Sequence, residues 1–371
     1  MTSCVSDDFL QAEDGSSLDY YGQRSGLRHA RRVVIAYLDG PFGIGKTTAA
    51  REFVSAPHEF ACYYISEPWR AWQNWISERN YIQEIYTTQK TRDASEISIE
   101  ESSKNMCAAQ MGIALPFKIT HRLLNDIIGN LLGPRRPLGP RDSVILADRH
   151  PLAAYVCFPL ARFIGGYITE LDVLTLLGSL PTCQRGANMI ITDLRLEELL
   201  SRITSRNRRH EEIQTSFVRI LRNVYILLMN TYTYLRKTRK LCQSALKSLP
   251  FFRSSVLYQK VIAKDLYPIP EPSIEDTVFA VVKSKRMLNA QGIHTPLIFW
   301  SLEHIAHTII NTQMFYLSVD TLSPGEWARE IESLLGSAHS IMTANKNLRT
   351  AIEKIELYNR DMAVQENPTI S

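Results

Sequence analysis

One short stretch, residues 37–48 with the sequence YLDGPFGIGKTT, constrains the fold of this 371-residue chain more than any other. It matches the phosphate-binding pattern G-x-x-x-x-G-K-[ST], with Gly40, Gly45, Lys46 and Thr47 in the fixed places. Such a loop binds phosphate only between a buried strand and a helix N-terminus. The chain provides both, because an apolar run precedes the loop and a helical pattern follows it.

Each part of this loop has an expected task. Backbone N–H groups wrap the phosphates, Lys46 reaches the β- and γ-phosphates, and the Thr47 hydroxyl binds Mg²⁺. We therefore expect a nucleotide with Mg²⁺ here. The predicted phosphate-binding residues are Gly40, Pro41, Phe42, Gly43, Ile44, Gly45, Lys46, Thr47 and Thr48.

Short apolar runs alternate with helical patterns along the rest of the chain, which is typical of an α/β fold with a parallel sheet. We expect a P-loop kinase fold in which helices flank a five-stranded parallel sheet. Ligands of such sheets bind beyond the carboxyl ends of the strands. The predicted strands are residues 33–38, 61–66, 144–147, 189–192 and 278–282.

Charged residues follow two of these strands. Glu67 follows the second, where it is either a general base for an acceptor hydroxyl or a surface glutamate before a turn proline. Asp148 follows the third, a usual place for a Mg²⁺ ligand, direct or through water. We expect Arg149 to face the acceptor and His150 to be structural.

Beyond the fourth strand lies an arginine-rich segment, which is either a solvated helix or a mobile lid over residues 195–212. We favour the lid, because several arginines indicate that water is excluded while a second substrate is phosphorylated. The arginines are Arg195, Arg202, Arg206, Arg208 and Arg209.

The ends of the chain differ in character. Residues 1–30 are polar and without period, which predicts a flexible tail before a single domain over residues 31–371. Four arginines near the tail's end form a solvated stretch or, less favoured, a nuclear import signal: Arg24, Arg28, Arg31 and Arg32. Two amphipathic helices are expected within residues 324–365, either on the sheet or at a subunit interface.

The Gly/Pro/Arg-rich loop 129–143 is expected to have no catalytic role.

Composition excludes several classes of protein. The net charge is only +4, so we expect no direct nucleic-acid binding, and no stretch is long and apolar enough to span a membrane. Six cysteines are scattered without a C-x-x-C pair, and the N-terminus has no signal-peptide pattern. We expect an intracellular, non-secreted protein with reduced thiols, in the host cytoplasm and possibly the nucleus.

Five segments together resemble the herpesviral thymidine kinases, most closely the alphaherpesvirus type: DGPFGIGKTT, EPWRAW, IYTTQ, DRHPLAAYVCFPLAR and LRNVYILLMNT. The resemblance runs from Tyr37 to the C-terminus, and residues 274–281 are similar to the family's adenine-side strand. It implies transfer of phosphate from ATP, with Mg²⁺, to the 5′-hydroxyl of thymidine, and of other pyrimidine deoxynucleosides or analogues, giving dTMP for viral DNA synthesis. We also expect a homodimer.

The resemblance implies a role for individual residues as well. Glu67 matches the general base, Arg149 matches its partner, and Gln110 matches the glutamine that bonds the thymine edge. Ile113 and Phe158 match the pair that sandwiches the base, although some relatives carry Met and Tyr there, and Tyr also where this chain has Phe117. The other matches are Trp72 in the nucleoside pocket, Tyr86 and Glu211 at the 3′-hydroxyl, Arg162 near the base through water, and Arg202, Arg206 and Arg208 in the lid.

The chemistry of Gln110 leaves the base open. Its amide can accept from thymine N3–H and donate to O4, and a flipped amide could serve cytosine instead. Deoxycytidine is therefore a second candidate substrate. Another P-loop small-molecule kinase on the same scaffold, a deoxycytidine or thymidylate kinase, is the alternative function. A nucleic-acid-dependent NTPase fits less well, because the chain has no aromatic–basic nucleic-acid motif.

Overall fold

The computed structural model describes residues 30–75, 78–124, 127, 132–182, 185–206, 214–238, 250–289 and 291–362. The predicted flexible tail, apart from its last residue, lies outside these residues. Within the described helices, no stretch combines the length and apolarity needed to cross a bilayer. Three of the cysteines are described, Cys62, Cys107 and Cys157, and they are free thiols.

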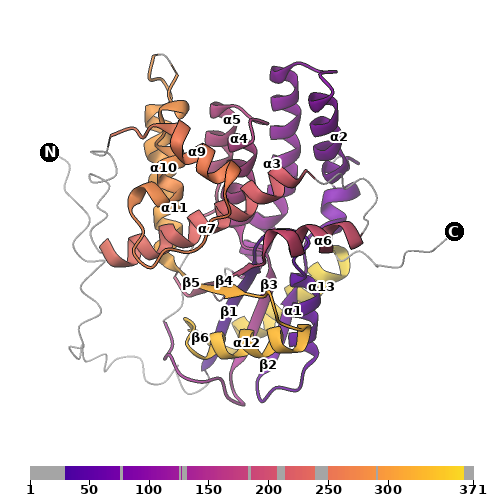
Figure 1. Ribbon diagram of the computed structural model, residues 1–371. Coiled ribbons are helices and arrows are strands. Elements are labelled where there is room, and N and C mark those ends of the chain that lie inside the picture. Colours follow the sequence, from indigo (N-terminus) through magenta and orange to yellow (C-terminus); the bar gives the residue numbers. More distant parts are fainter. Residues whose placement is uncertain are drawn as a thin grey trace.

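A six-stranded sheet lies in the lower half of the molecule, with α1, α12 and α13 around it (Figure 1). Five strands run parallel in the order β2-β3-β1-β4-β5, and β6 pairs antiparallel with the first residues of β1. Leu38 pairs with Asp148, so the residues that follow β1 and β3 leave the sheet side by side. The strands are β1 (Ala30–Asp39), β2 (Ala61–Ile65), β3 (Ser143–Asp148), β4 (Ala187–Asp193), β5 (Thr312–Ser318) and β6 (Ile341–Ala344).

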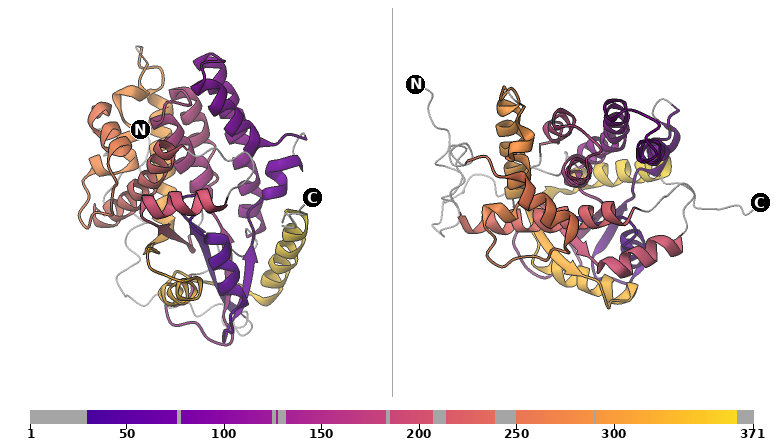
Figure 2. Two further views of the ribbon diagram at one scale, coloured as in Figure 1. Left: turned by 45° about the vertical axis from the view of Figure 1, so that its right-hand side comes forward. Right: turned by 45° about the horizontal axis from the view of Figure 1, so that its top comes forward.

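Helices cover both faces of the sheet, which explains why the central strand β1 is apolar on both sides. Val34, Ala36 and Leu38 pack with α1 (Lys46–Ser55) and α12 (Pro324–Gly336). The alternate residues of β1 pack with α13 (Asn345–Met362) on the opposite face (Figure 2). Both predicted C-terminal helices therefore pack against the body of the domain.

The upper half is a group of helices with its own apolar core (Figure 1). The helix α6 (Leu196–Arg206) crosses between this group and the sheet. This group of helices also contains two short π-helices, η2 (Ala71–Trp75) and η3 (Ala153–Cys157). The helices are α2 (Tyr81–Asp93), α3 (Ile99–Leu123), α4 (Phe158–Ile164), α5 (Glu170–Gly178), α7 (Thr215–Thr238), α9 (Ser254–Ala263), α10 (Val278–Val282) and α11 (Thr295–Asn311).

The prediction of a strand at residues 278–282 is wrong, because this run, VFAVV, is the helix α10. All five of its side chains are buried among α7, α9 and α11. A short run that is buried all round has no period to separate strand from helix, so packing decided the outcome. The fifth parallel strand is β5 instead, with the sequence TQMFYLS, and β6 was not predicted.

Arg32 departs from the predicted solvated basic stretch. It is buried, and its Nη1 lies 2.9 Å from Asp142 Oδ2, the residue before β3. Its Nη2 donates to the Arg136 carbonyl, and Arg136 itself contacts the other oxygen of Asp142. This loop of residues 132–142 therefore has a structural role, and Arg32 joins it to the start of the sheet.

Candidate active site

The phosphate-binding loop lies where β1 ends and α1 begins. Its backbone takes forms that only glycine adopts easily: φ is 140° at Gly40 and 82° at Gly43. A Cβ at Gly40 would lie 2.4 Å from the Thr192 carbonyl oxygen, and one at Gly43 would lie 2.2 Å from Ile203 Cγ1. Of the nine predicted loop residues, six line a cavity of about 370 Å³ between the sheet and the upper helices: Phe42, Gly43, Gly45, Lys46, Thr47 and Thr48.

Lys46 is buried and folds back over the loop. Its Nζ donates to the carbonyl oxygens of Gly40, at 3.2 Å, and Pro41, at 2.8 Å. Burial and the nearby Arg149 lower the pKa of Lys46 to about 8. The Lys46 ammonium group is therefore held by the two carbonyl oxygens of the loop. A bound phosphate would replace these neutral acceptors.

Thr47 and Asp148, the two predicted metal ligands, meet directly. The Thr47 hydroxyl donates to Asp148 Oδ2 at 2.7 Å, and the Tyr64 hydroxyl donates to the same oxygen at 3.1 Å. The other oxygen, Oδ1, is buried without a partner among the described residues. Burial and the neighbouring Glu67 raise the pKa of Asp148 to about 6. An unpaired buried carboxylate oxygen beside a hydroxyl fits a hard cation such as Mg²⁺.

Glu67 is not a surface glutamate, because it is buried to 8% exposure and lines the cavity. Arg149 donates from Nε to Glu67 Oε1 at 2.5 Å and from Nη1 to the Gly40 carbonyl at 2.9 Å. Its guanidinium also lies 5.3 Å from the centre of the Phe158 ring. The pair thus joins the loop, the end of β2 and the wall of the cavity.

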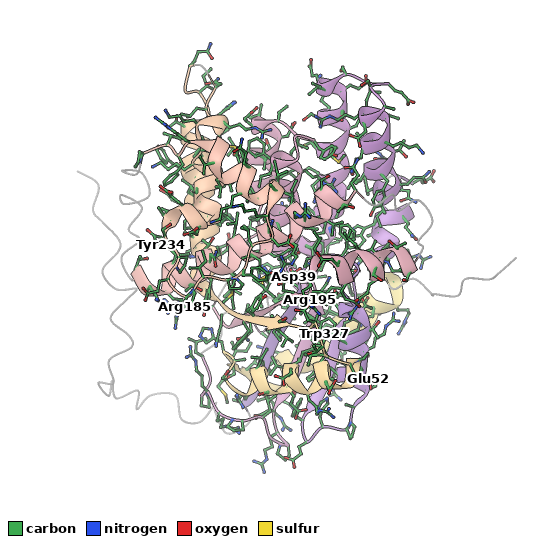
Figure 3. The ribbon with its side chains drawn as sticks, viewed as in Figure 1. Asp39, Glu52, Arg185, Arg195, Tyr234 and Trp327 are labelled. Carbon is green, nitrogen blue, oxygen red and sulfur yellow. The ribbon has the colours of Figure 1, made fainter. Side chains whose placement is uncertain are left out.

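Asp39 organises this region and was not predicted from the sequence. Figure 3 labels it near the centre of the molecule, at the junction of sheet and helices. Its carboxylate accepts from the backbone N–H of Gly40, the backbone N–H of His150 and the Tyr225 hydroxyl, at 2.8, 2.9 and 2.7 Å. Burial raises the pKa of Asp39 against the opposing effect of Arg149. The sequence signal that could have indicated Asp39 was a carboxylate at the end of an otherwise apolar strand.

His150 is structural, as its sequence position suggested. It is buried, its ring meets Tyr37 edge-on at 4.6 Å, and burial lowers its pKa to about 3. Burial therefore favours the neutral form of the imidazole.

The far end of the cavity is aromatic and apolar. The Trp72 indole N–H donates to the Ile113 carbonyl at 3.0 Å, and its ring lies 6.0 Å from Phe117. Pro116 lies inside α3 here, and Gly112 lets that helix approach the Tyr81 ring. The predicted nucleoside-side residues that line the cavity are Glu67, Trp72, Tyr86, Gln110, Ile113, Phe117, Arg149, Phe158 and Arg162.

Gln110 and Arg162 meet at the buried end. Arg162 Nε donates to Gln110 Oε1 at 3.1 Å, while Gln110 Nε2 donates to the Ala154 carbonyl at 2.9 Å. Arg162 Nη1 is buried without a partner among the described residues. Burial lowers the pKa of Arg162 to about 10, so the guanidinium keeps its charge at neutral pH.

The described arginines of the predicted lid have different surroundings in the structure. Arg206, at the end of α6, lines the cavity. Arg202 bonds to Glu198 and donates to the Ile44 carbonyl at 3.0 Å, so its contacts are to the loop backbone. Arg195 pairs with Asp320 outside the cavity. Arg208, Arg209 and Glu211 lie outside the described residues.

Several further residues line the cavity, although the sequence did not single them out. Ile82, Ile85 and Gln89 share one face of α2 with Tyr86, at spacings of three and four, so the helical period around Tyr86 was the available signal. Trp69 lies in the same EPWRAW segment as Trp72. The remaining additions are Arg51, Ala153, Ala154 and Phe217.

Known sequences show what this chain is similar to. The model of a family described as thymidine kinase from herpesvirus matches residues 40–319. The thymidine kinase of Psittacid herpesvirus 1 is 35% identical over 338 residues, which are 90% of this chain and 99% of the relative. That of infectious laryngotracheitis virus is 34% identical over 343 residues, 90% of this chain and 92% of the relative.

Solved structures agree with this. The crystal structure of EHV4-TK complexed with Thy and ADP has a TM-score of 0.81 and 27% identity to this chain. The match covers 91% of this chain and all of the other. The fold is therefore that of the herpesvirus enzymes, a P-loop kinase fold, which confirms the predicted fold class.

Proposed function

Because this chain belongs to the herpesvirus thymidine kinase family, we propose that it transfers the γ-phosphoryl group of ATP to the 5′-hydroxyl of thymidine, giving dTMP and ADP. A similar structure, EHV4-TK, is complexed with Thy and ADP, which supports a pyrimidine acceptor and an adenine nucleotide.

One observation carries the proposal: a single cavity of about 370 Å³ joins the phosphate loop to a base-sized aromatic pocket. Loop residues from Phe42 to Thr48 line one end, and Gln110 with its aromatic neighbours lines the other. Glu67 lies on the wall of the same cavity. A nucleoside and a nucleotide phosphate can thus lie next to each other in one cavity.

The chain's own groups then have defined tasks. Backbone N–H groups of the loop and Lys46 bind the β- and γ-phosphates. Ile113 and Phe158 hold the base between them, and Glu67 accepts the 5′-hydroxyl proton as the new O–P bond forms. Arg149 orients that carboxylate. The bond from the γ-phosphorus to the β,γ-bridging oxygen breaks, and arginines such as Arg206 stabilise the charge on the moving phosphoryl group.

Mg²⁺ fits the pair Thr47 and Asp148, which would hold it directly or through water. When bound, the ion neutralises charge on the β- and γ-phosphates. The chain contributes the Asp148 carboxylate, already oriented by the hydroxyls of Thr47 and Tyr64.

An assay with the purified full chain tests the proposal. ATP and Mg²⁺ are supplied with thymidine, deoxycytidine, dTMP or no acceptor, and ADP and the phosphorylated product are both quantified. We expect dTMP and ADP in equal amounts from thymidine. ATP hydrolysis without any acceptor, stimulated by DNA or RNA, would instead identify a nucleic-acid-dependent NTPase.

We also propose a homodimer through the paired helices α5 and α11. They approach closely, because a Cβ at Gly178 would lie 2.2 Å from the Trp300 ring. Leu171 on α5 and Leu297 and Trp300 on α11 are 50%, 41% and 49% exposed, although these side chains are large and apolar. Light scattering should give twice the chain mass for wild type and a single chain for Trp300→Glu. A monomeric wild type would contradict the dimer.

The intracellular location expected from the sequence is likewise a proposal. Fluorescence microscopy of the tagged chain in infected or transfected cells tests it, and secretion into the medium would contradict it.

A further inference from the structure

The helix α6 contacts both the phosphate-binding loop and the cavity. Arg206, in its last turn, lines the cavity. Ile203 packs against Gly43 of the loop. Arg202 Nη1 donates to the Ile44 carbonyl of the same loop at 3.0 Å. The direction in which α6 leaves the sheet therefore determines where Arg206 lies relative to the loop.

A small movement at the start of α6 has a large effect at its end. The helix spans Leu196–Arg206, 11 residues, so its length is roughly 16 Å at about 1.5 Å per residue. A tilt of about 4° at the first residue moves the last one by about 1 Å over this length. Misplacing a group by about 1 Å can lower a rate by roughly a hundredfold. The residues that hold the start of α6 thus control how well Arg206 is placed.

A buried arginine on the neighbouring helix α7 holds the residues that lead from β4 into α6, residues 193–195, which we call the α6 root. Arg222 is 1% exposed and donates from Nη2 to Asp193 Oδ2 at 2.8 Å. It also donates from Nε to the Leu194 carbonyl at 3.0 Å and from Nη1 to the Leu266 carbonyl at 3.2 Å. The donors of a guanidinium have fixed directions, so three such bonds define its orientation as well as its position.

The α6 root has further partners at the end of β5. The Tyr316 hydroxyl donates to Asp193 Oδ2 at 2.7 Å, and Asp320 Oδ1 accepts from the Arg195 backbone N–H at 2.7 Å. Asp193 is 4% exposed, and burial raises its pKa while Arg222 opposes this rise. A buried carboxylate that loses its positive partner is costly, so Arg222 is the contact on which the root depends most.

We infer, building on the proposed function, that Arg222 is a positioning residue for phosphoryl transfer, which holds the α6 root so that Arg206 reaches the transferring phosphoryl group. Arg222, Asp193 and Leu194 are all outside the set of cavity-lining residues. Arg222 therefore acts on the reaction through the backbone of α6 and not through contact with either substrate.

The test is a double-mutant cycle on kcat for thymidine, using the full chain at saturating ATP and Mg²⁺. Arg222→Met keeps the length of the side chain and removes its charge and donors. We expect it to lower kcat by roughly tenfold, with a change of less than about twofold in KM for thymidine. Arg206→Ala should lower kcat by roughly a hundredfold. Because Arg222 acts through Arg206, the double variant should be no slower than Arg206→Ala alone, whereas independent effects would multiply to roughly a thousandfold.

Arg219→Met is the matched control on the same helix. Arg219 lies one turn before Arg222, and its Nε is 3.1 Å from Asp265 Oδ1, so its described ion pair does not involve the α6 root. Its kcat should stay within about twofold of wild type. If Arg222→Met does not fold, Arg222→Lys takes its place in the cycle, because it keeps a positive charge near Asp193 but lacks the fixed fork of donors.

The outcomes separate the two proposals. A wild-type chain that forms no dTMP would overturn the proposed function and this inference with it. If wild type forms dTMP and the Arg222 variant has the same kcat, the kinase function stands and the inference fails. The inference also fails if the two effects multiply, since Arg222 then supports only the fold. An Arg206→Ala variant as fast as wild type would overturn it too, because Arg222 would have no group to act through.

Discussion

Arg149 donates to Glu67 at 2.5 Å from a backbone that is itself in the left-handed region, with φ of 73°. A non-glycine residue in this region stores strain on the order of 1–3 kcal/mol, which persists only when surrounding contacts determine it. Here Arg149 Nη1 also bonds to the Gly40 carbonyl, and Asp39 accepts from the next backbone N–H. The strained backbone aims the guanidinium at Glu67, so the two side chains are oriented as one unit.

Glu67→Gln keeps the size of this side chain and removes its capacity to take a proton. We expect kcat to fall by roughly two to four orders of magnitude, with a smaller change in KM for thymidine. Steady-state kinetics measure both. Glu52→Gln, an exposed substitution on α1, is the matched control and should leave kcat unchanged. An unchanged kcat in Glu67→Gln would reject the role as base.

Asp39→Asn tests the hydrogen-bond network of Asp39, which supports the Arg149–Glu67 pair. Every described partner of this carboxylate is a donor, including the Arg149 guanidinium, whose Nη1 lies 3.4 Å from Oδ1, so an amide would turn its NH₂ group toward other donors. We expect the free energy of unfolding to fall by about 3–5 kcal/mol, as for other broken buried ion pairs. Tyr225→Phe removes a single donor and should cost only about 1 kcal/mol. Thermal or urea unfolding measures the two, and equal effects would contradict the network.

The sequence predicted best where a local pattern and its chemistry coincide. The loop required a strand before it and a helix after it, and β1 and α1 are both present. Glu67 and Asp148 follow predicted strands, and parallel strands bring such ends to one edge, so both residues lie near the loop. These predictions needed only the order of the elements.

Other features depend on contacts between distant segments and could not be predicted in this way. The run VFAVV has strand-like composition but is helical, because surrounding helices bury all its sides. Asp39 has partners more than a hundred residues away, in the residues after β3 and in α7. The orientation of Gln110 depends on the Ala154 carbonyl and on Arg162, which no spacing in the sequence reveals.

Gly43→Ala should weaken nucleotide binding through two separate effects. The added Cβ would lie 2.2 Å from Ile203 Cγ1 on α6, and φ of 82° strains any residue with a Cβ. We expect KM for ATP to rise by roughly tenfold or more, because a displacement of the loop changes its contacts to the phosphates. Adding Ile203→Ala relieves the clash but not the backbone strain, so recovery should be partial. Full recovery would show that the clash alone matters.

Asn359 on α13 should influence Glu67, the proposed general base, through the backbone that leads to it. Its side chain donates to the Tyr64 carbonyl at 2.6 Å and accepts from the Ser66 backbone N–H at 3.0 Å, next to Glu67. Asn359→Ala leaves these groups without their partner. We expect a loss of about 1–3 kcal/mol in stability and a fall in kcat larger than the change in KM for ATP. Lys354→Ala, on the same helix, is the control. Unchanged kcat would limit Asn359 to a structural role.

Asp148→Asn should alter the Mg²⁺ requirement more than any step of nucleoside binding. The buried Oδ1 has no partner among the described residues, whereas Oδ2 accepts from Thr47 and Tyr64. Replacing the carboxylate by an amide removes the negative charge that a hard cation prefers, so the Mg²⁺ concentration for half-maximal activity should rise by roughly tenfold or more. Tyr64→Phe keeps the carboxylate and loses one hydrogen bond, so its Mg²⁺ curve should shift less. Titration of activity with Mg²⁺ after treatment with EDTA gives both curves, and KM for thymidine should stay nearly constant in each. A shift in KM for thymidine without a shift in the Mg²⁺ curve would place Asp148 on the acceptor side instead.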